Sequence, residues 1–402
     1  MEKEWIVIRG MGSVSPLGAS QEEIRQAYTT DQPFFQTIPS LDATVAVAPL
    51  SAAAEEAIHR LCQENPTYAT LDRTVQMAIV AARQAVAMAG WPLEAEQIPI
   101  GINLGSSRGA TGLFEQYHAE FLQDCGQRLP PATSPNTTLG NLASWVAQDL
   151  QTSGPMISHS VTCSTALQAF ANGVAWLRSG MAKRFLVGGT EAPLTPFTIA
   201  QMKSVGIYSP LGAGEYPCRP LGTEHRNTFV LGEGAAVFAL ERMTEAEISA
   251  LTASDIVVVE AVGLGFEQSP SKTGISREGL HFQQAMREAL HQAQVNASSI
   301  DGIVLHAPGT KAGDNAEQQA ITAVFGTEPP TFLSNKWRIG HTLGASGALG
   351  AELAFLQLTG ATHYVPGPSM ATTPLSHAPQ KIMVNAAGFG GNAACLLLSR
   401  GH

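Results

Sequence analysis

Short apolar runs alternate along the chain with segments whose apolar residues recur at helical spacing. In the first half, the apolar runs predict strands at 5–12, 98–104 and 155–161. The periodic segments predict helices at 72–90 and 166–177, the first of them capped by Asp72. Residues 20–70 are mixed in character and interrupted by prolines, so we assign few elements there. Strands that alternate with helices of this length are typical of βαβ units, so we expect an α/β protein with parallel sheets.

The second half of the chain repeats this order. Its pattern predicts strands at 256–259 and 302–305, a helix at 279–294, and a strand-then-helix passage at 332–358. We therefore expect two duplicated halves, 1–253 and 254–402, joined near 250–255. In this alignment Cys163 and His341 fall at similar places, so the loops of the two halves are expected to meet at one central site.

Cys163 lies where a predicted strand gives way to a predicted helix. At such a position the free N–H groups and the positive end of the helix dipole face the side chain. This environment lowers the pKa of a thiol and favours the reactive thiolate, which predicts a nucleophile. A buried structural cysteine is equally compatible with these residues alone.

Two of the eleven histidines stand out by position. His306 ends a predicted strand, and His341 follows Lys336 on a passage from loop to helix. Near the C-terminus, a glycine turn at 385–391 lies between two short apolar runs. Such a turn can direct a backbone N–H at a developing oxyanion. For each of these residues taken singly, a structural role fits as well as a chemical one.

The composition narrows the possible partners. A net charge of −10 and a pI of about 5.6 argue against nucleic acid and anionic membranes as partners. No apolar run approaches the roughly 20 residues that a membrane helix needs, and the N-terminus has no signal-peptide layout. The five cysteines lack metal-ligand spacing, so we expect reduced thiols in a cytoplasmic protein without a metal site.

Six motifs, taken together and in this order, resemble those of the β-ketoacyl-acyl-carrier-protein synthases, the elongating (type II) ketosynthases of the thiolase-like family. They are Val-Thr-Cys-Ser-Thr-Ala at 161–166, Gly-Gly-Thr-Glu at 188–191, Phe-Val-Leu-Gly-Glu-Gly-Ala at 229–235, His306 with Gly313, Asp314 and Glu317, Lys336 with Gly340 and His341, and Gly-Phe-Gly-Gly at 388–391. The resemblance covers nearly the whole chain. It implies a thiolase-like five-layer α/β/α/β/α fold of two duplicated halves, and a dimer.

The resemblance also implies a Cys-His-His site at Cys163, His306 and His341. The Cys163 thiolate would take an acyl chain from the pantetheine arm of a carrier protein as a thioester. Malonyl-carrier protein would then lose CO₂, and the two neutral histidines would stabilise the enolate that attacks this thioester. The N–H groups of Cys163 and Phe389 would form the oxyanion hole, and the charge of Lys336 would support the histidine pair. No metal or redox cofactor is implied, since phosphopantetheine arrives on the carrier.

Several residues depart from the family pattern around the substrate. Ala307 and Pro308 replace the glycine and the first threonine of the usual His-Gly-Thr-x-Thr motif, which leaves Thr310 as its one hydroxyl. Ala387 stands where a phenylalanine is usual, and Arg108 stands where an apolar residue usually lines the acyl pocket. These changes favour a specialised polyketide or polyene ketosynthase, such as those of aryl-polyene pathways, over housekeeping fatty-acid elongation.

The expected partner is an acyl carrier protein. Such carriers are acidic, so this acidic chain needs a local basic patch to bind one. Lys203, Arg219 and Arg226 follow the nucleophile helix and are candidates for that patch. The other subunit of the dimer is expected to be a second copy or a chain-length-factor-like homologue.

Two other functions remain open. One is a non-catalytic, chain-length-factor-like subunit of a ketosynthase heterodimer, although such subunits have normally lost the cysteine. The other is an acyltransferase or thiolase-type enzyme that uses Cys163 without decarboxylation, which the pair of histidines disfavours.

Overall fold

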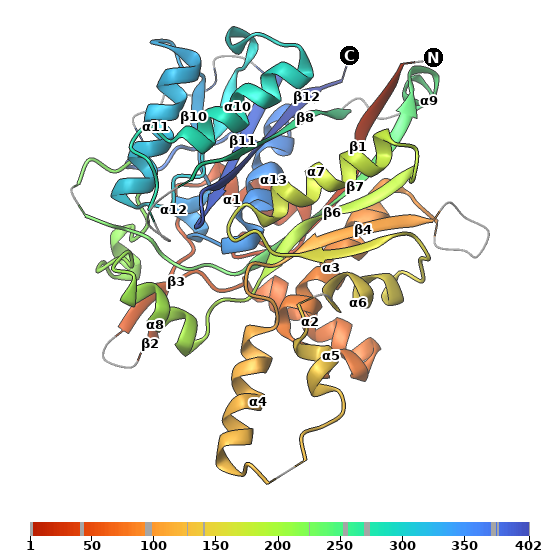
Figure 1. Ribbon diagram of the computed structural model, residues 1–402, viewed down its shortest axis with the longest axis vertical. Coiled ribbons are helices and arrows are strands. Elements are labelled where there is room, and N and C mark those ends of the chain that lie inside the picture. The colour runs from red at the N-terminus through yellow and green to blue at the C-terminus, as the bar shows by residue number, and fades with distance from the viewer. Residues whose placement is uncertain are drawn as a thin grey trace.

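The protein is built of five layers in which helices alternate with the two halves of a ten-stranded sheet (Figure 1). The computed structural model describes residues 3–40, 44–92, 99–126, 128–139, 141–224, 226–251, 256–268, 274–370, 375 and 378–401. The strands of the first half are β1 (Glu4–Val14), β4 (Ile100–Gly105), β5 (Met156–His159), β6 (Arg184–Glu191) and β7 (Gly234–Thr244). Those of the second half are β8 (Val257–Phe266), β9 (Gly302–Val304), β10 (Thr331–Leu333), β11 (Lys381–Gly388) and β12 (Asn392–Arg400).

The two halves of the sheet repeat the same strand order. The order is β5-β4-β6-β7-β1 and then β8-β12-β11-β9-β10, so equivalent strands lie equally far from the β1–β8 junction. β6, β4 and β5 are parallel, as are β11, β9 and β10, whereas β1, β7, β8 and β12 run antiparallel to their neighbours. At the junction, Val7 pairs with Val258 and Ile8 with Val257. The shared order and sense of pairing confirm the predicted duplication.

Two helices separate the two halves of the sheet. α7 (Thr165–Arg178) and α13 (Ser346–Leu358) pack against each other and against strands of both halves. A side chain at Gly347 would place its Cβ 2.7 Å from Leu167, so the small residue allows α13 to approach α7 closely. The apolar side chains of these helices and of both facing sheet surfaces form one continuous core.

Further helices cover the outer faces of the sheet. α3 (Arg73–Ala89) and α6 (Asn141–Asp149) cover the first half. α10 (Leu280–Ala293) covers the second half, and α11 (Lys311–Phe325) packs beside α10. The order of layers is therefore the predicted five-layer α/β/α/β/α arrangement.

The remaining elements lie in the connections between these layers. They are α1 (Gln21–Thr29), β2 (Gln36–Pro39), β3 (Thr44–Val47), α2 (Ala52–Glu64), α4 (Thr111–Gln123), α5 (Thr133–Thr137), α8 (Pro196–Ser204), α9 (Glu245–Ser249) and α12 (Lys336–Ile339). Short 3₁₀ helices are present at Pro66–Thr70, Ala213–Glu215, Ala297–Ser299 and Leu343–Ala345. β2 and β3 form a separate antiparallel pair, and α4 projects from the body of the molecule (Figure 1).

The predicted elements of both halves are present, with their ends shifted by a few residues. α3 begins where predicted because Asp72 Oδ1 accepts a hydrogen bond from Thr74 N at 2.8 Å, and Gly90 ends it with a φ of 65°. The predicted parallel strands are present in both halves, but each half of the sheet also contains antiparallel strands. β11 and β12 are joined by a tight turn, and strands joined in this way run antiparallel.

Some predictions fall on residues that the structure does not describe. The join near 250–255 and the boundary between residues 253 and 254 fall at 252–255, outside the described residues, and stay predictions. Residue 98, the predicted start of the strand that became β4, also lies outside them. Among the helices that the structure does describe, none combines the length and apolarity needed to cross a bilayer.

Candidate active site

Cys163 lies in a strained turn between β5 and the start of α7. Thr162, the residue before it, has a φ of 49°, in the left-handed region that residues other than glycine rarely adopt. Side chains that follow the cysteine hold this turn. Thr165 Oγ1 donates to Thr162 O at 2.6 Å, and Ser164 Oγ donates to Asn392 Oδ1 at 2.6 Å. The residues next to Cys163 therefore fix the place of its thiol at the start of α7.

The turn between β11 and β12 packs directly onto the Cys163 turn. A side chain at Gly388 would place its Cβ 1.7 Å from Thr162 Oγ1 and 2.9 Å from Cys163 N, so only glycine allows this approach. Asn392 Nδ2 donates to Phe389 O at 3.1 Å and shapes the turn. Within the described residues, the N–H groups of Cys163 and Phe389 donate no hydrogen bond. Both donors are therefore free to serve as the oxyanion hole that the sequence predicts.

His341 is held by the segment that precedes β7 and by its own loop. His341 N donates to Val230 O at 2.7 Å, and Gly340, with a φ of 65°, lets the two segments approach. The N–H of Leu343 donates to His341 Nδ1 at 2.9 Å. Because Nδ1 is an acceptor, a neutral His341 carries its proton on Nε2 and can donate from there.

His306 follows β9 in a loop organised by two buried carboxylates. Glu317 accepts hydrogen bonds from the backbone N–H groups of His306 and of the next residue, at 2.9 and 2.6 Å. Asp314 accepts from the backbone farther along the loop, including Thr310 N at 3.0 Å. Lys336 Nζ donates to the carbonyl oxygen that precedes His306, at 2.8 Å. The loop and the cation behind it are thus fixed by residues of the second half.

Glu191, at the end of β6, connects the loops of the two halves. Its buried carboxylate accepts hydrogen bonds from Ser106 Oγ at 2.7 Å, Ser107 N at 2.8 Å and Gly344 N at 2.8 Å. The two serines follow β4 in the first half, whereas Gly344 follows His341 in the second. One carboxylate therefore aligns the His341 loop against the half that contains Cys163.

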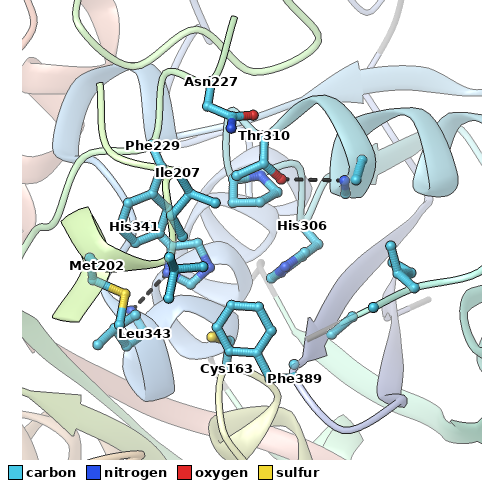
Figure 2. Close-up of a pocket in the computed structure, with 18 of the residues that line it drawn as sticks. Cys163, Met202, Ile207, Asn227, Phe229, His306, Thr310, His341, Leu343 and Phe389 are labelled. Carbon is cyan, nitrogen blue, oxygen red and sulfur yellow. Dashed lines mark hydrogen bonds between the residues drawn. The ribbon is translucent and has the colours of Figure 1, made fainter. Parts of the chain in front are cut away.

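Cys163, His306 and His341 line one cavity of about 260 Å³ (Figure 2). The rings of the two histidines are nearly perpendicular, with centroids 5.3 Å apart. Figure 2 shows them between Cys163 at one end and Thr310 at the other. The apolar part of the wall includes Met202, Ile207, Phe229 and Leu343. One thiol and two imidazoles can therefore act on a single bound group.

Burial determines the charge of these three groups. It lowers the pKa of His341 to about 3 and the pKa of His306 well below its usual value, and the charge of Lys336 acts in the same direction. Both rings are therefore neutral near pH 7. Burial also raises the pKa of Cys163 to about 12, an effect strengthened by the charge of Glu191 and opposed by that of Lys336.

The predicted low pKa of Cys163 is wrong. The thiol lies at the start of α7 as expected, but the loss of solvation destabilises the thiolate and raises the pKa of the thiol. The resting thiol is therefore protonated, and a base must take its proton as the sulfur attacks. The neutral imidazole of His306, in the same cavity, can do so.

We expect the alkylation of Cys163 by iodoacetamide to accelerate from about pH 6 to about pH 9 without levelling off. A thiol with a pKa of about 12 gains roughly tenfold in thiolate for each pH unit below that value. Peptide mass mapping separates Cys163 from the exposed Cys125. A rate that reaches a plateau near neutral pH would show a thiolate stabilised by its surroundings and would contradict the raised pKa.

The other predicted pocket residues are divided between two hollows. Thr310 and Ala387 line the cavity with Cys163, and Thr310 Oγ1 also caps α11 by accepting from a backbone N–H at 3.3 Å. Arg108 is not among the described residues that line this cavity. It borders a second hollow beside α4, and its guanidinium donates to Gln201 Oε1. The structure does not bring Arg108 to Cys163, so its role toward the substrate stays a prediction.

Two of the three basic residues predicted to bind a carrier line one hollow. Arg219 and Arg226 border it together with Lys311, and both arginines form ion pairs with Glu224. Lys203 is not among the described residues of that hollow. It lies on α8, where its Nζ donates to a serine hydroxyl at 2.9 Å. The two arginines therefore line one hollow, and Lys203 is not among the described residues that line it.

The sequence pattern did not reveal His281 and Glu267. His281 lines the cavity, and its Nδ1 lies 3.1 Å from Glu267 Oε2. The two residues are far enough apart in the chain that no local motif links them. The one feature of the sequence that could have pointed to His281 is its position one helical turn before Ala285, on the buried face of α10.

Two family models match the chain, the β-ketoacyl synthase N-terminal domain at residues 3–246 and the β-ketoacyl synthase C-terminal domain at residues 256–366. The chain is 28% identical to the 3-oxoacyl-[acyl-carrier-protein] synthase 2 of Coxiella burnetii, over 100% of this chain and 99% of that protein. It is 30% identical to the putative polyketide β-ketoacyl synthase 1 of Streptomyces cyaneus, with 82% of each chain covered. It also resembles the solved structure of the ishigamide ketosynthase/chain length factor, with a TM-score of 0.83 and 23% identity over 100% of both chains.

The match of the family models extends over both halves of the fold. The first model includes Cys163, and the second includes His306 and His341. These are the residues that the folded chain brings into one cavity. The chain therefore belongs to the β-ketoacyl synthase family.

Proposed function

We propose that the protein is an elongating β-ketoacyl-acyl-carrier-protein synthase. Cys163 takes an acyl chain from a carrier protein, and a malonyl group on a carrier then condenses with that chain after losing CO₂. One observation supports this above all: loops of both halves bring one thiol and two neutral imidazoles into a single cavity. A non-catalytic subunit has no need of this set, and a simple acyltransferase has no need of the second imidazole.

Acyl transfer begins when the Cys163 sulfur attacks the thioester carbonyl of the carrier's arm. The thiol proton passes to the neutral imidazole of His306, and the carbonyl oxygen becomes an oxyanion that accepts from the N–H groups of Cys163 and Phe389. When the tetrahedral intermediate collapses, the bond to the arm's sulfur breaks and that thiol leaves with the proton. One thioester has replaced another, so no oxidant or reductant is consumed.

Condensation uses the histidines of the second half. The Nε2–H of His341, oriented by Leu343, donates to the thioester oxygen of the malonyl group, and His306 is the second donor when it is in the tautomer with its proton on Nε2. As the bond to the carboxylate breaks, CO₂ leaves and its electron pair forms an enolate at this oxygen. The charge of Lys336 favours the negative oxygen. The enolate carbon then attacks the Cys163 thioester, forms the new C–C bond and releases the sulfur.

The proposed setting is polyketide or polyene biosynthesis, with fatty-acid elongation as the second possibility. Ala387 leaves space in the cavity wall where the family usually has a large ring. Relatives named for a polyketide β-ketoacyl synthase and for a ketosynthase/chain length factor support this setting. The carrier partner brings the phosphopantetheine, and the second subunit is a copy of this chain or a chain-length-factor-like homologue. The duplicated units are 1–253 and 254–402.

Mass spectrometry tests the proposed reaction. Acyl-carrier protein alone should add one acyl group to Cys163. Adding malonyl-carrier protein should then give a carrier-bound β-ketoacyl chain that is longer by an acetyl unit. Acylation without extension would indicate the non-decarboxylating acyltransferase, and no acylation would indicate the non-catalytic subunit.

Replacing Arg226 by glutamate should raise the KM for the carrier roughly two- to tenfold at low salt, with little effect on kcat. The Arg226 side chain is 51% exposed and borders the hollow that shares Thr310 with the catalytic cavity. An acidic carrier is attracted to the positive charge of Arg226 at the edge of this hollow, and salt screens the attraction. Steady-state kinetics at low and high salt measure the effect.

Arg60→Glu, an exposed change on α2, is the matched control and should leave the KM unchanged. Lys203→Ala tests separately whether the surface of α8 takes part. If Arg226→Glu and the wild type had the same KM at low salt, the carrier would have to bind elsewhere.

A further inference from the structure

A third histidine lines the cavity that contains Cys163. His281, in the first turn of α10, is 1% exposed. Its Nδ1 lies 3.1 Å from Oε2 of Glu267, the residue that follows β8. Neither residue has a part in the proposed reaction, so this buried ionisable pair needs another explanation.

Glu267 is placed to remain a carboxylate. Burial alone would raise the pKa of Glu267. Its carboxylate, however, accepts hydrogen bonds from Ser276 N at 2.7 Å and from Ser276 Oγ at 2.6 Å, and these outweigh burial, so the pKa is lowered. The two atoms are not aligned for a hydrogen bond, but a carboxylate oxygen at 3.1 Å would repel a lone pair on Nδ1, so Nδ1 of His281 carries the proton of the neutral ring. Burial lowers the pKa of His281, opposed by the charge of Glu267, and the ring is neutral near pH 7. Nε2 of a neutral ring in this tautomer is an acceptor.

Nε2 is the polar atom of His281 that reaches the cavity. Nδ1 is sealed from solvent beside Glu267, without an aligned hydrogen bond. Nε2 is not among the sealed atoms, and it too has no hydrogen-bond partner within the described residues. His341 has the opposite arrangement, because its Nδ1 accepts from Leu343 N and its Nε2 donates. The cavity therefore contains a donor on His341 and an acceptor on His281.

The other polar side chains of the cavity already have hydrogen-bond partners. Asn227 donates to one backbone oxygen and accepts from one backbone N–H, both at 3.0 Å. Thr310 Oγ1 accepts from the backbone of α11 at 3.3 Å. The thiol and the other two histidines serve the reaction. Among the described side chains of the cavity wall, His281 thus has an acceptor with no hydrogen-bond partner and no part in the reaction, whereas Thr310 Oγ1 keeps one lone pair beside its bond to the backbone.

We propose that His281, held by Glu267, accepts a hydrogen bond from an N–H or O–H group of the thioester substrate, and so positions and selects it. This inference rests on the proposed function, since the bound group is then a carrier-linked acyl thioester. Two parts of such a substrate bear a suitable donor, the amides of the pantetheine arm and a hydroxyl on the acyl chain. In both cases His281 is a positioning residue rather than a catalytic one.

The test compares the acylation of Cys163 by three thioesters in the wild type, His281→Leu and His281→Gln. The N-acetylcysteamine thioester of hexanoate has an amide N–H, the S-butyl thioester of 3-hydroxyhexanoate has a hydroxyl, and the S-butyl thioester of hexanoate has neither. Relative to the donor-free thioester, His281→Leu should slow acylation by a donor-bearing one about three- to tenfold. His281→Gln has an amide oxygen in place of Nε2 and should recover part of the rate. Intact mass measures each rate constant.

Two further variants separate positioning from packing. His291→Leu, at the exposed end of α10, is the matched control and should leave all rate ratios unchanged. Glu267→Gln keeps the imidazole but can donate to Nδ1, which turns Nε2 into a donor. It should therefore impair the same thioesters as His281→Leu.

A selective loss for the amide thioester would assign the contact to the pantetheine arm, and a selective loss for the hydroxyl thioester would assign it to the acyl chain. An equal change for all three thioesters, or no change for any, would overturn the proposal.

If no thioester acylates Cys163 in the wild type, the proposed function fails, and binding tests His281 by itself. Calorimetry on Cys163→Ala protein should then show pantetheine or 3-hydroxyhexanoyl-pantetheine binding about three- to tenfold more weakly once His281→Leu is added. Unchanged binding of both ligands would overturn the proposal in that case too.

Discussion

The Cys163→Ala protein is expected to lose acyl transfer from the carrier by a factor on the order of 10⁴ or more, with no acyl group on any other cysteine. Cys218 and Cys395 are buried, and Cys163 is the one cysteine among the described residues of the cavity wall. No other thiol is therefore placed to take the chain. Intact mass after incubation with acyl-carrier protein, followed by peptide mapping, measures the loss.

The same variant separates the two half-reactions. His306 and His341 are untouched by the change, so Cys163→Ala should still release CO₂ from malonyl-carrier protein. Cys125→Ser, an exposed change, is the matched control and should be acylated at the wild-type rate. An acyl group on another residue of an active Cys163→Ala protein would refute the choice of nucleophile.

The second large effect is expected at His341. His341→Asn should slow the release of CO₂ about 10²–10³-fold, while acylation of Cys163 changes much less because His306 remains as a base. The asparagine Oδ1 lies where Nδ1 lies in histidine, so it can still accept the hydrogen bond that Leu343 N donates at 2.9 Å. The loop keeps its shape, and only the Nε2 donor is removed. Single-turnover acylation and CO₂ release are measured separately.

His341→Gln is the matched rescue for this experiment. Its amide nitrogen lies near the position of Nε2 and can donate, so part of the CO₂ release should return. Burial lowers the pKa of His341 to about 3, and above its pKa the ring is neutral, so ionisation of this group should not alter the wild-type rate between about pH 5 and about pH 8. If His341→Asn reduced both half-reactions equally, the histidine would not be specific to decarboxylation.

Helices with one continuous apolar face could be placed from the residues alone. α3 and α10 are amphipathic, and the cap of α3 is formed by a residue next to it. The relative direction of neighbouring strands could not be predicted from the residues in the same way. β7 and β12 run antiparallel because of the connections that bring them beside β1 and β8, which local periodicity does not report. The elements between residues 20 and 70, among them the amphipathic helices α1 and α2, were not assigned from the sequence.

The motifs also could not predict the direction in which a side chain points. Arg108 follows a strand that leads to the site, but its guanidinium donates a hydrogen bond to Gln201, which is 93 positions away in the chain, and so does not line the catalytic cavity. His281 lies within an ordinary amphipathic pattern, and it becomes an unusual residue only when Glu267 is placed beside it. In both cases the deciding partner comes from a different element of the fold.

From the residues alone one can infer a duplicated α/β protein resembling the ketosynthases, with Cys163, His306 and His341 as candidate reactive groups. Periodicity and motifs are properties of neighbouring residues, so they need no knowledge of contacts. The folded chain was needed to show that these groups share one cavity, that the thiol is protonated and that the imidazoles are neutral. Charge and tautomer depend on excluded water and on hydrogen-bond partners. Those partners come from segments far apart in the chain, as Glu191 and Gly344 do where they join the two halves of the site.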